Sequence, residues 1–445
     1  MPNEILSRIF FHCLDDNPLD ILQPSVRVAP LLLCQICSLW RTVALSLPEL
    51  WEYLYLRLED PYTHPGSPGI LQKDIDILGL WTSNASYLHP SLHLTFNTPF
   101  FPRQWKVKQD NFVHFETLFE FICSARLLDL IWLNNLNIFS SHTDQYEAYD
   151  FPNLEILALE VGAVARYPPR SKFEIRAPSL RRLALNRKLY DQEYTLTKYS
   201  FHWEHLTHCF IAYRIGLGTW YEILTSCVNL VCGAFFVQKF FSERYKPTVL
   251  PNLRQLNISF GSNGLPENIF LDLSFPFLKA LRLTNRSPCC RKFFLQEILV
   301  PMPSLVELHL NTLFEVDNSS DVLSKFVPNL QILVFSVLAP TPLLDSIAEA
   351  LRSPWLTNGW LSKRTEPGLI KCIVNPRDKF KPIREGQIAE DVCQHLVSLP
   401  EYPFTSVLAT EESPKWNCSY WPIMTAYKLE HRWHEFMEFF QRSYD

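Results

Sequence analysis

The sequence predicts an α/β chain: a short helical module followed by a solenoid with parallel strands inside an arc and helices outside. Three observations predict this fold. A leucine pattern recurs nine times between residues 127 and 330, at steps of 23 to 27 residues. In six of the nine copies a proline stands two residues before the first leucine. Two apolar stripes with helical spacing precede these copies, within residues 5–47.

The amino-terminal stripes predict two amphipathic helices. Pro2 and Glu4 suit a first helical turn, where proline loses no bond and a carboxylate meets the positive end of the helix dipole. The first stripe comprises Ile5, Leu6, Ile9, Phe10, Cys13 and Leu14. The second comprises Leu32, Leu33, Ile36, Cys37, Trp40, Val43, Ala44 and Leu47. Pro48 ends this helix. Two such helices cannot bury both stripes alone, so they either pack on the next domain or offer a stripe to a partner.

The repeated pattern is Leu-x-x-Leu-x-apolar. Its six strong copies are Leu154-Leu157-Leu159, Leu180-Leu183-Leu185, Leu253-Leu256-Ile258, Leu278-Leu281-Leu283, Leu305-Leu308-Leu310 and Leu330-Leu333-Phe335. Three weaker copies are Leu127-Leu130-Trp132, Leu206-Cys209-Ile211 and Leu230-Gly233-Phe235. The preceding prolines are Pro152, Pro178, Pro251, Pro276, Pro303 and Pro328. A proline there ends a helix and favours an extended strand start.

A period in the twenties with this pattern is typical of leucine-rich repeats. Each unit is expected to add one short parallel strand and one outer helix, and to bury its leucines by stacking on its neighbours. Such repeats usually place Asn or Cys a few residues after the last leucine. Here those places hold Gly162, Lys188, Arg214, Gln238, Gly261, Arg286 and Leu313. We therefore expect a degenerate repeat and an irregular arc.

The chain is expected to divide into four regions. Residues 1–51 form the helical module, and residues 52–110 form irregular first repeats or a connector, with strands at Leu54–Leu58 and Leu92–Phe96. Residues 111–340 form the degenerate repeats. Residues 341–445 form a carboxy-terminal cap, with a last strand at Ile370–Val374 and a terminal helix at Tyr427–Phe440.

Composition argues against several functional classes. Charge is nearly balanced, with 41 Lys and Arg against 46 Asp and Glu, so nothing indicates a nucleic-acid or acidic-membrane partner. With 12 glycines and no phosphate-binding glycine motif, a nucleotide enzyme is not expected.

No stretch reaches the roughly 20 apolar residues of a membrane span. The first fourteen residues carry Glu4 and Arg8, so no signal peptide is expected. Scattered cysteines (12) indicate reduced thiols in an intracellular protein, cytoplasmic or nuclear.

Candidate chemistry is sparse. His202-x-x-His205-x-x-His208 with Cys209 lies across a predicted helix-to-strand corner, where ring nitrogens need not converge on a metal. His431-x-x-His434 has no third ligand nearby, and Cys34-x-x-Cys37 falls inside the second predicted helix. We predict no catalytic residue, metal or cofactor. An enzyme with a cryptic site would need titratable groups that converge in one pocket.

The order Pro-x-Glu-Ile-Leu-x-x-Ile-Phe, Leu-x-x-Cys-x-x-Trp-Arg and Leu-Trp resembles an F-box of the type common in large fungal families. It covers residues 1 to about 51. In that family the module binds the Skp-type linker of a Skp–cullin–F-box ubiquitin ligase. The resemblance therefore implies nine linker-facing residues: Pro2, Ile5, Leu6, Ile9, Phe10, Ile36, Cys37, Trp40 and Trp51.

F-box proteins often carry degenerate repeats, so the resemblance implies a substrate-recognition adaptor of a cullin-RING ligase whose arc binds a target protein. Alternation along each strand puts the position between the second and third apolar residues of each copy on the concave side. The residues at this position are Ile131, Ala158, Ala184, Phe210, Ala234, Asn257, Arg282, His309 and Val334. We expect Phe210, Asn257, Arg282, Glu307 and His309 to form the target-binding patch. The simpler alternatives are solvated strand residues, and a non-catalytic scaffold whose amino-terminal helices only cap the solenoid.

Overall fold

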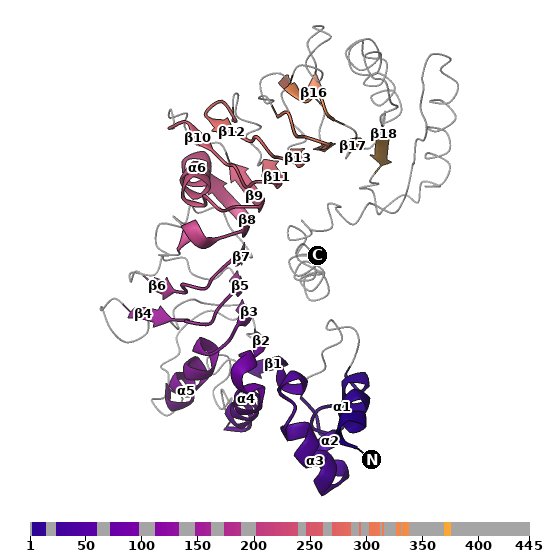
Figure 1. Cartoon of the computed structure of the whole chain (residues 1–445). Helices are drawn as coiled ribbons and strands as arrows, with labels where there is room; N and C mark the ends of the chain where they lie inside the picture. Colours follow the sequence, from indigo (N-terminus) through magenta and orange to yellow (C-terminus); the bar gives the residue numbers. More distant parts are fainter. Residues whose placement is uncertain are drawn as a thin grey trace, which may run out of the picture. The chain divides into compact units, whose positions relative to one another are not determined.

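A computed structural model places a helical module and two sets of parallel strands (Figure 1). It describes residues 2–14, 24–59, 72–97, 112–132, 147–161, 173–187, 202–238, 246–260, 269–285, 293–294, 302–311, 314–315, 326–330, 332–337 and 369–374. The expected terminal helix at 427–440 lies outside these ranges. The chain falls into two compact units. The described part of the first unit ends at residue 206, and that of the second begins at residue 207.

The amino-terminal module comprises α1 (Asn3–His12), α2 (Leu33–Ile36), α3 (Ser38–Leu45) and the 3-10 turn η2 (Pro48–Trp51). Pro2 precedes α1 as its N-cap and Glu4 lies in its first turn, as the sequence predicts. Leu6 and Phe10, one turn apart, are the buried residues of α1. The ring of Phe10 packs on Trp40 of α3, with the centroids 5.0 Å apart.

The second predicted helix is in fact two helices. Cys37 adopts an extended conformation (φ −161°, ψ 170°) and separates α2 from α3. Its thiol accepts a hydrogen bond from the backbone N–H of Trp40, with Sγ···N 3.5 Å, so the cysteine acts as the N-cap of α3. Serine and aspartate are the usual signals for such a cap. A cysteine in an apolar stripe gave no sign of the break.

The strands of the first unit are parallel and neighbour one another in chain order. They are β1 (Tyr53–Glu59), β2 (Ser91–Asn97), β3 (Leu127–Trp132), β5 (Ile156–Val161) and β7 (Arg182–Arg187). β1 and β2 confirm the two strands expected in residues 52–110. Helix α4 (Gln72–Ala85) connects β1 to β2, and α5 (Phe112–Cys123) connects β2 to β3. Short strands β4 (Glu147–Asp150) and β6 (Phe173–Arg176) occupy the next two connections and pair with each other.

The second unit repeats the arrangement. Its parallel strands are β8 (His208–Gly216), β9 (Cys232–Gln238), β11 (Gln255–Phe260), β13 (Ala280–Asn285), β15 (Glu307–Asn311), β17 (Ile332–Val337) and β18 (Leu369–Val374). β18 confirms the last strand expected at 370–374. Helix α6 (Leu217–Ser226) connects β8 to β9. Further connections hold the short paired strands β10 (Thr248–Val249) with β12 (Leu273–Ser274), and β14 (Phe293–Phe294) with β16 (Phe314–Glu315).

The fold is therefore a mixed α/β chain whose parallel strands stack as in a solenoid, with few helices. In the part of the chain that the structure describes, the connections that hold β4, β6, β10, β12, β14 and β16 contain these short strands and not the expected outer helix. The local sequence gives the reason around β10, where Pro247 and Pro251 flank the β-branched residues Thr248 and Val249. Prolines at that spacing leave no room for a helical turn, and β-branched residues favour a strand.

The leucine columns form as predicted within each unit. Leu157 pairs in register with Leu183. In the second unit one row runs through Cys209, Gly233, Leu256, Leu281, Leu308 and Leu333. Leu183, Leu281 and Leu308 are fully buried. Gly233 stands in a leucine position because a Cβ there would lie 2.7 Å from a ring carbon of Phe235, whose side chain fills that space.

One weak copy of the pattern is shifted in the structure. β3 pairs Leu128 with Leu157 and Leu130 with Leu159, so the copy is offset by two residues from the predicted Leu127-Leu130-Trp132. Asp129, rather than Ile131, is consequently the register partner of Ala158. Leu127 and Leu128 are both buried, on opposite faces of the strand. A shift of two residues keeps every side chain on its own face, so alternation alone does not exclude it.

The corners before the strands are held by a ladder of polar side chains. The residue just before the first leucine bonds to a backbone carbonyl one repeat earlier: Ser179 Oγ to Pro152 at 3.0 Å, His205 Nδ1 to Pro178 at 3.0 Å, Asn252 Nδ2 to Val228 at 3.4 Å and Asn329 Nδ2 to Pro303 at 2.7 Å. Each bond ties one turn to the turn before it. The polar ladder thus lies at the start of these strands, whereas leucine-rich repeats usually have theirs after the last leucine.

Candidate functional site

The amino-terminal module exposes an apolar surface. Of the fourteen large apolar side chains that are exposed among the described residues, eight lie within residues 5–45. They are Ile5, Ile9, Phe11, Val26, Leu32, Ile36, Leu39 and Leu45. We call these eight residues the amino-terminal apolar surface. Scattered single apolar residues are normal on a protein surface, but a group of them on one small module is a candidate for an interaction site.

The nine predicted linker-facing residues divide by burial. Pro2, Ile5, Ile9, Ile36 and Cys37 are exposed, and Trp40 is half-buried against Phe10. Leu6, Phe10 and Trp51 are at most 1% exposed and form the core of the module. The helical spacing could not tell core residues from exposed residues, because Ile5 and Leu6 are adjacent in sequence, as are Ile9 and Phe10. In each pair one residue faces the core and the other the solvent.

Phe11, Val26, Leu32, Leu39 and Leu45 were not among the predicted site residues. A signal for Phe11 was present in the sequence. Apolar side chains of α1 at positions 5, 6, 9, 10 and 11 cover more of its circumference than the single stripe that a helix needs for packing. The surplus predicts a second contact surface.

Two tryptophans hold the module on the first strands. Trp51 Nε1 donates to the carbonyl of Ala44 in α3 at 2.9 Å, and its ring meets that of Trp81 in α4 edge-on, with centroids 4.9 Å apart. Trp81 Nε1 donates to the carbonyl of Tyr53 in β1 at 2.9 Å. A continuous set of contacts therefore runs from α3 to β1.

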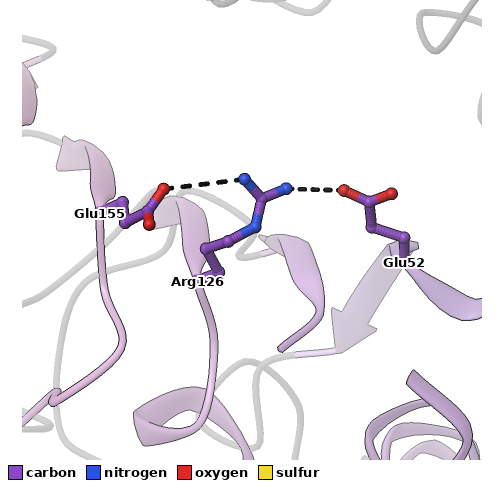
Figure 2. Close-up of polar contacts among 3 residues, drawn as sticks. All are labelled: Glu52, Arg126 and Glu155. Carbon is purple, nitrogen blue, oxygen red and sulfur yellow. Dashed lines mark hydrogen bonds and ion pairs between the residues drawn. The ribbon is translucent and has the colours of Figure 1, made fainter. Parts of the chain in front are cut away.

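A charged triad adds a second attachment. Figure 2 shows the guanidinium of Arg126 between the carboxylates of Glu52 and Glu155. The Nη2···Oε1 distance to Glu52 is 2.6 Å, and the Nη1···Oε2 distance to Glu155 is 3.7 Å. Glu52 directly follows η2, while Arg126 and Glu155 precede β3 and β5. The triad therefore joins the end of the module to the starts of two strands.

The predicted target-binding residues meet in one register row of the second unit. Phe210 pairs with Ala234, Ala234 with Asn257, Asn257 with Arg282, and Arg282 with His309. Glu307 lies in the adjacent row, opposite Ala280. We call the sheet face that holds positions 210, 257 and 282 the inner face. Four of the five predicted residues, Phe210, Asn257, Arg282 and His309, therefore share one continuous row.

The inner face is less exposed than a solvated strand face. Phe210 and Arg282 are 8% and 7% exposed, while Asn257 and Glu307 are half-buried. The side chain of His309 lies outside the description. The patch thus consists of a buried aromatic ring and a buried cation beside two accessible polar groups. Phe210 and Arg282 are therefore not the fully solvated strand residues that the simpler interpretation expected.

The histidines near residue 205 do not gather into a metal site. His205 Nδ1 is occupied by the Pro178 carbonyl, and His208 Nδ1 lies 3.0 Å from Thr207 Oγ1. His202 Nδ1 pairs with Glu204 at 3.3 Å. A backbone hydrogen bond, and then His202, lower the pKa of Glu204. In the part of the chain that the structure describes, no three His, Cys, Asp or Glu side chains are placed to hold a metal ion.

Two comparisons bear on the whole chain. The sequence matches no protein family model, and no curated protein matches it. Within the described ranges, no helix has the length and apolar character needed to cross a bilayer.

Proposed function

We propose that the chain is a non-enzymatic substrate-recognition adaptor of a Skp–cullin–F-box ubiquitin ligase. The module of residues 1–51 acts as the F-box and docks on the Skp-type linker, and the leucine-rich-repeat-like strands bind a target protein. The amino-terminal apolar surface is the observation that carries the proposal. It lies on the same helices that carry the F-box-like motif, where the resemblance requires a partner.

The attachment of the module supports an adaptor role. The Trp51–Trp81 contact and the Arg126 triad fix α3 and η2 relative to β1, β3 and β5. A linker held on the module would therefore take a defined orientation relative to these strands. The chain itself makes or breaks no bond. It acts by raising the effective concentration of a target near the ubiquitin-charged enzyme.

A plain interaction scaffold is the second candidate. It is favoured by the burial of Leu6, Phe10 and Trp51, since a module that only caps the solenoid would bury these same residues. A capping role alone does not explain why Ile5 (45%), Ile9 (36%) and Ile36 (52%) are exposed. A ligase partner accounts for both sets of residues.

Affinity purification of the tagged full-length chain from cells tests the proposal. The bound fraction is probed for the Skp-type linker and the cullin. We expect both to be recovered, and to be lost together from the Ile9→Asp/Ile36→Asp variant. Leu271→Asp is the matched control, because Leu271 is exposed in the second unit. Recovery of target proteins without linker or cullin would instead favour the scaffold.

A further inference from the structure

The inner face carries a polar cluster at the centre of the second unit. Asn257 and Ser259 are two residues apart on β11 and so lie on the same face. Their register partners are Ala234 and Phe236 on β9, and Arg282 and Thr284 on β13. Ser259 is 1% exposed and Arg282 is 7% exposed. We call Asn257, Ser259 and Arg282 the inner polar site.

Two atoms of this site are buried without a bond. Asn257 Oδ1 and Ser259 Oγ find no hydrogen-bond partner among the described residues. Gln255, the preceding residue on the same face of β11, differs, since its Oε1 accepts from the Cys232 thiol at 3.4 Å. Buried polar atoms in folded proteins are almost always bonded, and each exception calls for an explanation. A ligand that supplies the missing partners is such an explanation.

Charge and access define the ligand. The register row through Asn257 also contains Arg282, His309 and, further along, Lys371, which makes it basic. Glu307 in the neighbouring row opposes the approach of a polyanion such as a nucleic acid. Asn257 of this row, and Gln255 and Glu307 of the neighbouring row, are half-exposed, so the inner face is open to solvent at β11 and β15.

We propose that the inner polar site binds an extended peptide segment that carries an aspartate or glutamate. The peptide carboxylate accepts from the Arg282 guanidinium and from Ser259 Oγ–H, a charge-assisted pair of bonds. Asn257 takes the peptide backbone, because its Oδ1 accepts a main-chain N–H while its Nδ2 donates to a main-chain carbonyl. Phe236, the register partner of Ser259 on β9, borders the site. Identifying this peptide with a target segment rests on the proposed function, whereas the binding chemistry does not.

A random peptide library displayed on phage and selected on the full-length chain tests the proposal. Selected peptides should be enriched in Asp and Glu at one position. One such peptide, labelled with fluorescein, is then titrated by anisotropy. Arg282→Gln and Ser259→Ala should each weaken its binding by at least about tenfold. Lys279→Gln, a matched exposed cation just before β13, should leave the affinity unchanged.

Thermal unfolding of the same variants separates binding from a structural role. Ser259 Oγ lacks a partner within the described residues, so Ser259→Ala should leave the melting temperature unchanged or raise it while it weakens peptide binding. The proposal is overturned if no acidic peptide is selected, or if Ser259→Ala binds as the wild type does. If the Arg282→Gln variant does not fold, the peptide affinity of the Ser259→Ala variant alone tests the proposal. Linker binding is measured on the same samples; its absence would count against the adaptor function and not against this site.

Discussion

Burial determines the chemistry of the described cysteines. Cys232 is buried on β9, and burial raises the pKa of its thiol to about 12. Burial, with a smaller effect of Asp150, raises the pKa of Cys123 to about 11. Burial and a hydrogen bond to Cys227 raise the pKa of Cys209. These thiols remain protonated at neutral pH and lack the thiolate that nucleophilic or metal-binding cysteines need.

The raised pKa values make stability fall at alkaline pH. In the unfolded chain a thiol ionises near pH ~8.5, but folded Cys232 ionises only near pH 12. Between these values the unfolded state binds fewer protons, so the free energy of unfolding decreases as pH rises. Each such thiol contributes a slope of about 1.4 kcal/mol per pH unit. Urea unfolding from pH 8 to 10.5 should show that Cys232→Ala has a shallower decline than the wild type. Equal slopes would mean that the thiol is not buried in solution.

Single residues also show where a sequence is ambiguous. Hydrophobicity placed Leu6 and Ile5 in one stripe, yet Leu6 is in the core and Ile5 is on the surface. Trp51 was expected at the linker interface because the F-box resemblance implies it. The structure uses its ring and its N–H within the chain. Which of two adjacent apolar residues faces inward depends on the rotation of the helix against its neighbours, and that is a tertiary property.

At the level of elements, the stacked strands depend on the leucine columns. Leu281 on β13 is fully buried and lies in register between Leu256 and Leu308. Leu281→Ala should lower the free energy of unfolding by about 2–5 kcal/mol, because packed methyl groups are replaced by a cavity. Leu271→Ala is the control, since Leu271 is 69% exposed and should change stability little. Chemical denaturation measures both. A similar loss for the two variants would argue against the column.

The corner ladder gives a graded prediction. Asn329 Nδ2 bonds to the Pro303 carbonyl at 2.7 Å, whereas Asn252 reaches the Val228 carbonyl only at 3.4 Å. Both side chains are exposed, so water replaces part of each bond. Asn329→Ala should cost about 0.5–1.5 kcal/mol of unfolding free energy, and Asn252→Ala less. The reverse order, or no loss in either variant, would show that the ladder does not hold the turns.

Elements were predicted well where the pattern is periodic. The strong leucine copies gave the register of β5, β7, β11, β13, β15 and β17, because their leucines align from one strand to the next. β3 was misplaced by two residues, because such a shift keeps every side chain on its own face and alternation does not exclude it. Outer helices were expected where short strands form, since the leucine period specifies the inner strand and leaves the connection open. Cys37 separates α2 from α3, and its thiol caps the start of α3. No sequence rule anticipates such a cap.

At the level of the whole molecule, the proposal joins two surfaces of different character. The amino-terminal apolar surface has no charged residue among its eight members and is suited to a constant partner. The inner face combines an aromatic ring, a cation and amide groups, as expected for selective recognition. The sequence alone indicated three of the eight residues of the first surface, through the F-box-like motif, and the register row of the second, through strand alternation. It could not show that the module is fixed to β1 through Trp51 and Trp81.

The claim that the module docks on a Skp-type linker is tested most directly by calorimetric titration of the purified full-length chain with the purified linker. The wild type should bind with one-to-one stoichiometry, and so should Leu271→Asp. Ile9→Asp/Ile36→Asp should lose binding, because the complex would bury two unpaired carboxylates against an apolar surface, and it should unfold at the wild-type temperature. Phe10 is not substituted, because it is buried and a change there could abolish binding by unfolding the module. A wild-type chain that does not bind the linker, or a double variant that binds as tightly as the wild type, would contradict the account.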